Sequence, residues 1–179
     1  MQGEGLVTEN DGMGERAAGG AVVMGAGEGR AIWFLGNLMV LKATAASTGG
    51  AYGLLESWVP AGASPPLHIH HREDESFWLL EGSMTVRCGD EIFSAGPGSY
   101  VFLPRDVPHT FRVDGTAQAH MLTMLTPGGG ESFFVEGGRK AESATLPPPA
   151  RPDLAQLERV AHEFGSEFVG PPLPAAEGP

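Results

Sequence analysis

The sequence contains a single cysteine, Cys88, among its 179 residues, so no disulfide can form within the chain. It also lacks an apolar run of about eighteen residues, the length that a membrane-spanning helix needs. Residues 1–30 show neither the basic segment nor the apolar segment of a secretory signal peptide. From these absences we expect a cytoplasmic protein that keeps its cysteine reduced.

Basic residues are scarce. The chain has 11 Lys and Arg residues against 22 Asp and Glu residues, which gives a formal net charge of -11. A surface of this sign repels the phosphates of nucleic acids and the headgroups of anionic lipids. We therefore expect neither nucleic acid nor a membrane as a partner.

Helical periodicity is absent between residues 30 and 140. Short apolar runs alternate there with Gly and Pro, and a turn signal recurs about every eight to twelve residues, which is typical of an all-β sandwich or barrel. No segment is repeated, so this region predicts one barrel. The runs include AIWFLG, LMVLKATA, AYGLLESWV, SFWLLEG, SMTVRCG, SYVFLP, HTFRV, AQAHMLTML and SFFVEG.

The two flanks differ from the middle. Residues 1–29 are rich in Gly and Glu and predict a flexible N-terminal arm. Residues 141–179 predict a Pro-rich connector, a short helix and a tail. The helix begins after Pro152, and its apolar residues recur at helical spacing and end near Gly165. These apolar residues are Leu154, Leu157, Val160, Ala161 and Phe164.

Three histidines and one glutamate form a pattern that predicts a metal site. His68 and His70 are two residues apart, so they point to the same side of a strand. Glu75 follows near the start of the next strand, and His109 opens the run HTFRV beyond a second hairpin. Three neutral imidazoles and a carboxylate suit one divalent transition metal: Fe, Mn, Ni, Co or Zn.

Two segments resemble the two motifs of the cupin superfamily. In the first motif, His68, His70, Glu75 and Gly82 match at every spacing. In the second, Gly98, Pro104 and His109 match, whereas Asp106 replaces a glycine and Val113 replaces the usual asparagine. Asp tolerates left-handed backbone conformations better than most residues, so the change at position 106 is mild.

This resemblance implies a single cupin barrel, which is a double-stranded β-helix related to the jelly roll, with a short C-terminal helix. It also implies that His68, His70, Glu75 and His109 are the metal ligands. The stretch PPLHIHHREDESFWLLEG and the later segment LERVAHEFGSEFVGPPL are similar to single-domain cupins related to quercetin 2,3-dioxygenase. Because exposed edge strands need cover, we also expect a homodimer.

The resemblance leaves three functional hypotheses. The first is a metal-dependent dioxygenase, with iron as one candidate metal, that uses dioxygen on an enolic or phenolic, flavonol-like small molecule. Glu75 is then the catalytic base, and Phe77, Met84 and Phe111 bind the substrate. The second is a non-redox isomerase or cyclase of the polyketide-tailoring type, in which the metal acts only as a Lewis acid. The third is a non-enzymatic cupin that binds a small molecule.

Overall fold

The structure is a computed structural model that describes residues 21–25 and 27–175. Most of the predicted N-terminal arm, residues 1–29, lies outside these residues. The elements in chain order are β1 (Arg30–Phe34), β2 (Asn37–Ala43), α1 (Ala45–Thr48), β3 (Gly53–Val59), β4 (Leu67–His70), β5 (Asp74–Glu81), β6 (Met84–Cys88), β7 (Glu91–Ala95), β8 (Tyr100–Leu103), β9 (His109–Val113), β10 (Ala119–Thr126), α2 (Glu131–Gly137), β11 (Arg139–Lys140), α3 (Leu154–Glu163) and β12 (Ser166–Gly170).

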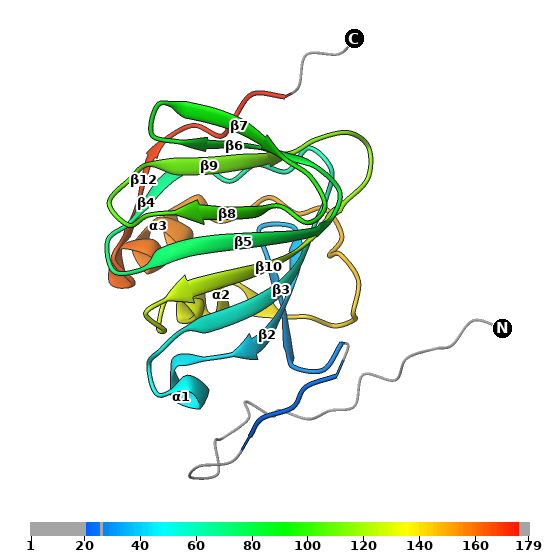
Figure 1. The fold of residues 1–179 in the computed structure, drawn as a ribbon, viewed down its shortest axis with the longest axis vertical. Helices are drawn as coiled ribbons and strands as arrows, with labels where there is room; N and C mark the ends of the chain where they lie inside the picture. Colours follow the sequence, from blue (N-terminus) through cyan, green and yellow to red (C-terminus); the bar gives the residue numbers. More distant parts are fainter. Residues whose placement is uncertain (1–20, 26, 176–179) are drawn as a thin grey trace, which may run out of the picture.

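Two antiparallel sheets make up the barrel, as predicted for an all-β protein (Figure 1). The larger sheet has the order β11-β1-β2-β3-β10-β5-β8, and the smaller has the order β12-β4-β9-β6-β7. Because β5 lies in the larger sheet and β4 in the smaller, the chain crosses between the sheets within the segment that carries His68, His70 and Glu75. This crossing allows residues that are close in sequence to face one another across the barrel.

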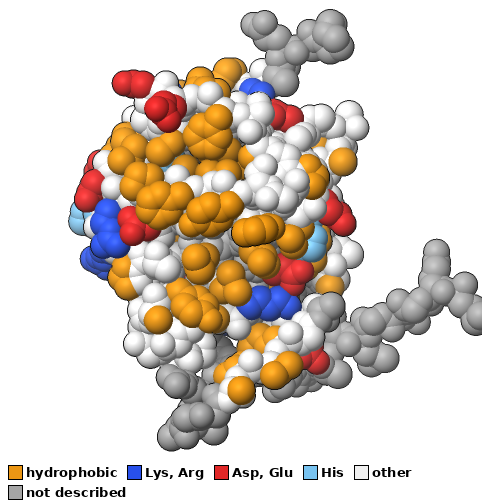
Figure 2. Space-filling view, in the orientation of Figure 1, with side chains coloured by type: hydrophobic (Ala, Val, Ile, Leu, Met, Phe, Trp, Pro, Cys, Tyr) orange, Lys and Arg blue, Asp and Glu red, His pale blue; other side chains and the backbone are white. Residues whose placement is uncertain are grey.

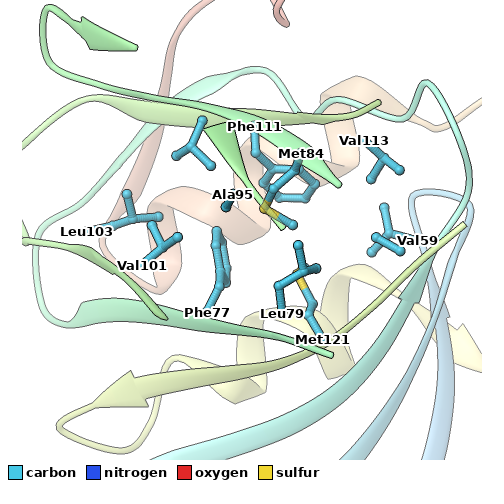
Figure 3. Packing of buried hydrophobic residues seen from close by; sticks show 12 residues of the cluster. Val59, Phe77, Leu79, Met84, Ala95, Val101, Leu103, Phe111, Val113 and Met121 are labelled. Atoms are coloured by element: carbon cyan, nitrogen blue, oxygen red, sulfur yellow. The ribbon is translucent and has the colours of Figure 1, made fainter. Parts of the chain in front are cut away.

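The alternation of side chains along the strands builds the core. Strands β3 and β10 bury every second residue, the signature of a strand with one face inside. Figure 3 shows side chains of both sheets meeting in the middle, with Met84 and Phe111 from one sheet facing Phe77, Leu79 and Met121 from the other. The Phe77 and Phe111 rings lie edge to face, with centroids 5.4 Å apart.

The run SFFVEG, which was predicted as a strand, is instead part of helix α2, so this prediction was wrong. A strand would point Phe133 and Phe134 to opposite faces. In the helix both rings pack against Phe34, with centroids 5.2 and 5.1 Å away. The Glu131 carboxylate accepts hydrogen bonds from the backbone N–H groups of Gly129 and Ala45, which holds the start of the helix in place.

The C-terminal helix α3 packs against α2 and leads into a strand that the sequence did not reveal. The helix begins as predicted, with the Asp153 side chain accepting a hydrogen bond from the Gln156 N–H group. It buries Leu157 and Ala161 in a second apolar cluster together with α2. Strand β12 then pairs with β4, so Ser166 lies opposite His70. Residues 154–170 therefore pack on the barrel and extend its smaller sheet by one strand.

The outer face of the larger sheet carries exposed apolar side chains. Trp78, Leu80, Tyr100 and Phe102 are each between 37% and 55% exposed and lie on β5 and the edge strand β8. Figure 2 shows hydrophobic side chains gathered on this face. The expected homodimer stays a prediction. Among the described residues, no helix has the length and apolar character required to cross a membrane.

Candidate metal centre

Strand pairing brings the four predicted ligands together from both sheets. His68 on β4 lies directly opposite His109 on β9. His70 is one pleat further along β4, and Glu75 approaches from β5 in the other sheet. One potential ligand atom from each of the four side chains lies within 4.8 Å of the others. The side chains thus converge on one point, as the spacing of the motifs predicted.

The turn before His109 contains the left-handed backbone conformation that the sequence predicted Asp106 could adopt. Asp106 has a φ of 63°, in the left-handed region where the cupin motif usually carries glycine. Its N–H group donates a hydrogen bond of 2.8 Å to the carbonyl oxygen of His70. This bond ties the turn that leads into β9 to the end of β4, and so fixes the positions of His109 and His70 relative to each other.

Backbone carbonyl groups select the protonation form of two histidines. Nδ1 of His68 lies 2.8 Å from the carbonyl oxygen of Pro66, and Nδ1 of His109 lies 2.9 Å from that of Val107. Because a carbonyl oxygen only accepts, each Nδ1 must carry the proton. When such a ring is neutral, its lone pair is then on Nε2, the atom that in His109 lies near Glu75. This is the tautomer that a metal ligand requires.

Nδ1 of His70 also has contacts, with two residues whose role was not predicted from the sequence. This atom lies 2.9 Å from the Ser166 hydroxyl and 3.3 Å from a carboxylate oxygen of Glu73. Glu73 belongs to the acidic run Glu73-Asp74-Glu75, yet it is only 3% exposed, so it is buried and not solvated. The strand β12 that supplies Ser166 was also missed.

The charges at the centre follow from burial and from these contacts. Burial, together with the neighbouring His109 and His70, lowers the pKa of His68 to about 3, so its ring is neutral at physiological pH. Burial alone would raise the pKa of Glu75, but the His109 contact and the charges of the surrounding histidines lower it. Glu75 is therefore a carboxylate. The pKa of His70 is raised, because Glu73 and Glu75 outweigh the opposing effect of burial.

The four side chains fit a metal ion in both geometry and chemistry. Nε2 of His70 and of His109 are buried and have no hydrogen-bond partner among the described residues. They lie 3.9 and 3.3 Å from a carboxylate oxygen of Glu75. Two donors bound to one ion at about 2.1 Å and at right angles would be about 3 Å apart, so little movement is needed. Three imidazoles and a carboxylate could hold any of the predicted divalent metals.

A cavity of about 380 Å³ opens onto this centre, a volume within the range of small-molecule sites. Phe77 and Phe111, two of the predicted substrate-binding residues, line it together with His68, His70 and Glu75. The third, Met84, is not among the lining residues and is fully buried in the core between the sheets. Its strand β6 lies beyond β9 in the smaller sheet, further from the cavity. Leu154, Leu157 and Phe168, from α3 and β12, complete the wall.

The fold and the candidate ligand set are both similar to those of cupins. Residues 56–125 match the family described as "Cupin domain", so this part of the chain is a cupin domain, in agreement with the two motifs. The solved structure of a predicted oxalate decarboxylase from Thermotoga maritima superposes on this chain with a TM-score of 0.52 at 19% identity. The match covers 60% of this chain and 99% of the Thermotoga maritima chain. At this identity the likeness shows the fold alone.

Two curated relatives carry the same name, quercetin 2,3-dioxygenase. The protein of Bacillus subtilis (strain 168) is 29% identical over 138 residues, which are 77% of this chain and 40% of the relative. That of Aspergillus japonicus is 31% identical over 114 residues, which are 59% of this chain and 32% of the relative. The chain thus spans about a third to two fifths of the length of these relatives.

Glu73 offers a test of how the residues behind the ligands support the centre. We expect Glu73→Gln to weaken metal binding about tenfold, because it removes the charge that orients and polarises His70 from its Nδ1 side. A competitive titration against a chromophoric chelator measures the change. The matched control is Asp74→Asn, which makes the same charge change one residue away, where the carboxylate pairs with Arg105. Equal affinities for the two variants would contradict the expectation.

Proposed function

We propose that the protein is a metal-dependent dioxygenase that acts on an enolic or phenolic, flavonol-like small molecule. The observation that carries this proposal is that three residues of the His68, His70, Glu75 and His109 cluster line a mostly apolar cavity, namely His68, His70 and Glu75. The name shared by the two curated relatives supports the choice of substrate class. In this proposal Glu75 is the base, and the three histidines hold the metal.

Glu75 is suited to accept the proton of a substrate hydroxyl. It is buried, and its lowered pKa keeps it ionised at neutral pH, so it approaches the reaction as a base. The three imidazoles hold the centre through Nε2 while their Nδ1 atoms stay engaged with Pro66, Val107 and the Glu73–Ser166 pair. A divalent metal held by these four residues would supply Lewis acidity.

The cavity walls supply the apolar surroundings that such a substrate requires. The rings of Phe77 and Phe111 present edges and faces to a planar ligand, and Phe133 and Phe134 line the region under α3. Leu154, Leu157 and Phe168 of α3 and β12 add further apolar side chains to these walls. The geometry therefore favours a flat aromatic molecule with its acidic hydroxyl directed at Glu75.

Oxygen consumption tests the proposal directly. We expect protein loaded in turn with Fe(II), Mn(II), Co(II) or Ni(II) to consume one dioxygen per quercetin with at least one of these metals, in proportion to bound metal. Protein loaded with redox-inert Zn(II) is the control and should consume none. If no metal supports oxygen uptake with any enolic substrate, the dioxygenase is ruled out. The non-redox isomerase or cyclase hypothesis, which needs only the base and the Lewis acid, then takes its place.

A further inference from the structure

Five buried polar side-chain atoms of the described residues have no hydrogen-bond partner there. Two of them, Nε2 of His70 and of His109, belong to the candidate metal centre. The other three are the hydroxyls of Ser57 and Thr123 and the side-chain oxygen of Asn37, and all three residues line the same cavity. Buried polar groups in folded proteins are nearly always paired, so such a concentration in one cavity points to a ligand.

The strand register places these three residues along one diagonal of the larger sheet. Leu125 of β10 lies opposite Glu75 of β5, and Thr123 is the next inward residue of β10. In turn, Thr123 lies opposite Leu55 of β3, and Ser57 is the next inward residue of that strand. From Glu75, each step along this diagonal therefore goes to the neighbouring strand and two residues further along the sheet.

Asn37 continues the same diagonal on the following strand. Ser57 lies opposite Met39 of β2, and Asn37 is two residues before Met39 on the same side of that strand. Diagonal neighbours of this kind are typically about 7–8 Å apart. Because β5, β10, β3 and β2 are consecutive strands of the sheet, Thr123, Ser57 and Asn37 form a polar track that leads away from the metal centre.

The surroundings of the polar track are apolar. The buried neighbours on the same strands include Leu55, Val59, Met39 and Met121, and Phe34, Phe133 and Phe134 also line the cavity. A ring system could therefore pack against the walls, while only groups that reach the track could form hydrogen bonds. The hydroxyl of Ser64, which also lines the cavity, differs because it already accepts a hydrogen bond from the Leu173 N–H group.

We infer that the polar track is the specificity-determining part of the substrate site, a conclusion that rests on the proposed function. It binds hydroxyl or carbonyl groups on the ring that lies furthest from the metal centre. The ligand is an extended aromatic molecule with an enolic hydroxyl at one end and at least one further oxygen function at the other. Ser57 and Thr123 can each donate and accept, which suits phenolic hydroxyls.

The test compares two flavonols that share the enolic end. Quercetin carries further ring hydroxyls, and 3-hydroxyflavone lacks them. Binding of both to Zn(II)-loaded protein is measured by calorimetry without oxygen, so turnover does not enter the readout. We expect the wild-type protein to prefer quercetin. Thr123→Val and Ser57→Ala should each weaken quercetin binding about threefold to tenfold, the usual effect of losing one hydrogen bond. The affinity of both variants for 3-hydroxyflavone should stay unchanged.

The control variant is Ser76→Ala. Ser76 is also buried on β5, but its hydroxyl pairs with that of Tyr100 away from the cavity. It should leave the preference for quercetin intact. If Thr123→Val and Ser57→Ala both keep the wild-type ratio of the two affinities, the inference is overturned.

A second measurement separates failure of the polar track from failure of the proposed substrate. In the ligand-free protein the hydroxyls of Ser57 and Thr123 have no partner among the described residues, so removing them should leave the melting temperature unchanged or raise it. If the wild type binds neither flavonol, the proposed substrate class is wrong, and the inference falls with it. If the wild type binds quercetin, a clear fall in melting temperature for both variants would show a structural role of the two hydroxyls and overturn the inference; an unchanged or higher value would support it.

Discussion

Glu75→Gln is expected to keep most of the bound metal and to lose most of the oxygen consumption. The amide is nearly isosteric with the carboxylate, and the three imidazoles are held by contacts that do not involve this side chain. An amide cannot accept the proton of a substrate hydroxyl at neutral pH, and general base catalysis is typically worth about 10²–10⁴-fold. The measurement is oxygen uptake per bound metal with quercetin.

A carboxylate elsewhere in the barrel provides the matched control. Glu56 on β3 also contacts a histidine, since its carboxylate lies 2.9 Å from Nε2 of His120, but this pair is outside the cavity. Glu56→Gln should retain wild-type turnover per metal. Wild-type turnover by Glu75→Gln would show that some other group accepts the proton.

The barrel and the convergence of the four candidate ligands were predictable because they depend on local patterns. Alternating apolar residues and regularly spaced turns define the strands, and the spacing of His68, His70 and Glu75 matches a motif in which strand geometry itself brings the side chains together. The substitution at Asp106 could also be judged from backbone preferences, and its positive φ agrees with that judgement. None of these features required knowledge of which distant segments pair.

The features that were missed depend on long-range packing. Nothing local distinguishes Glu73 from its acidic neighbours Asp74 and Glu75, and its burial follows from contacts with His70 and Gly130. Strand β12 is stable because it has β4 as a partner. Helix α2 forms where two adjacent phenylalanines meet Phe34. The sequence did carry one signal for the polar track: Thr123 and Ser57 occupy core positions in strands that otherwise alternate regularly.

His109→Ala is expected to reduce metal occupancy and oxygen consumption together, in contrast to Glu75→Gln. His109 supplies the Nε2 atom nearest to Glu75 and comes from a strand that the other three residues do not share. Its removal would leave only three candidate ligands for the ion, namely His68, His70 and Glu75. Loss of a partner that only orients a ligand costs about 10–100-fold in metal affinity, so loss of a ligand should cost more. Metal analysis after dialysis, paired with oxygen uptake, measures both quantities.

Two further variants make this result interpretable. His109 is 1% exposed, so its truncation also leaves a cavity in the barrel; His109→Gln retains more volume and should show the same loss of metal if folding is not the cause. His120→Ala removes a histidine that pairs with Glu56 and stacks on Trp58, and it should keep wild-type metal content. If His109→Gln is folded and retains full metal content after dialysis, His109 is not a ligand. The remaining donors would then have to be sought among His68, His70 and Glu75, with Glu73 as the nearest additional carboxylate to His70.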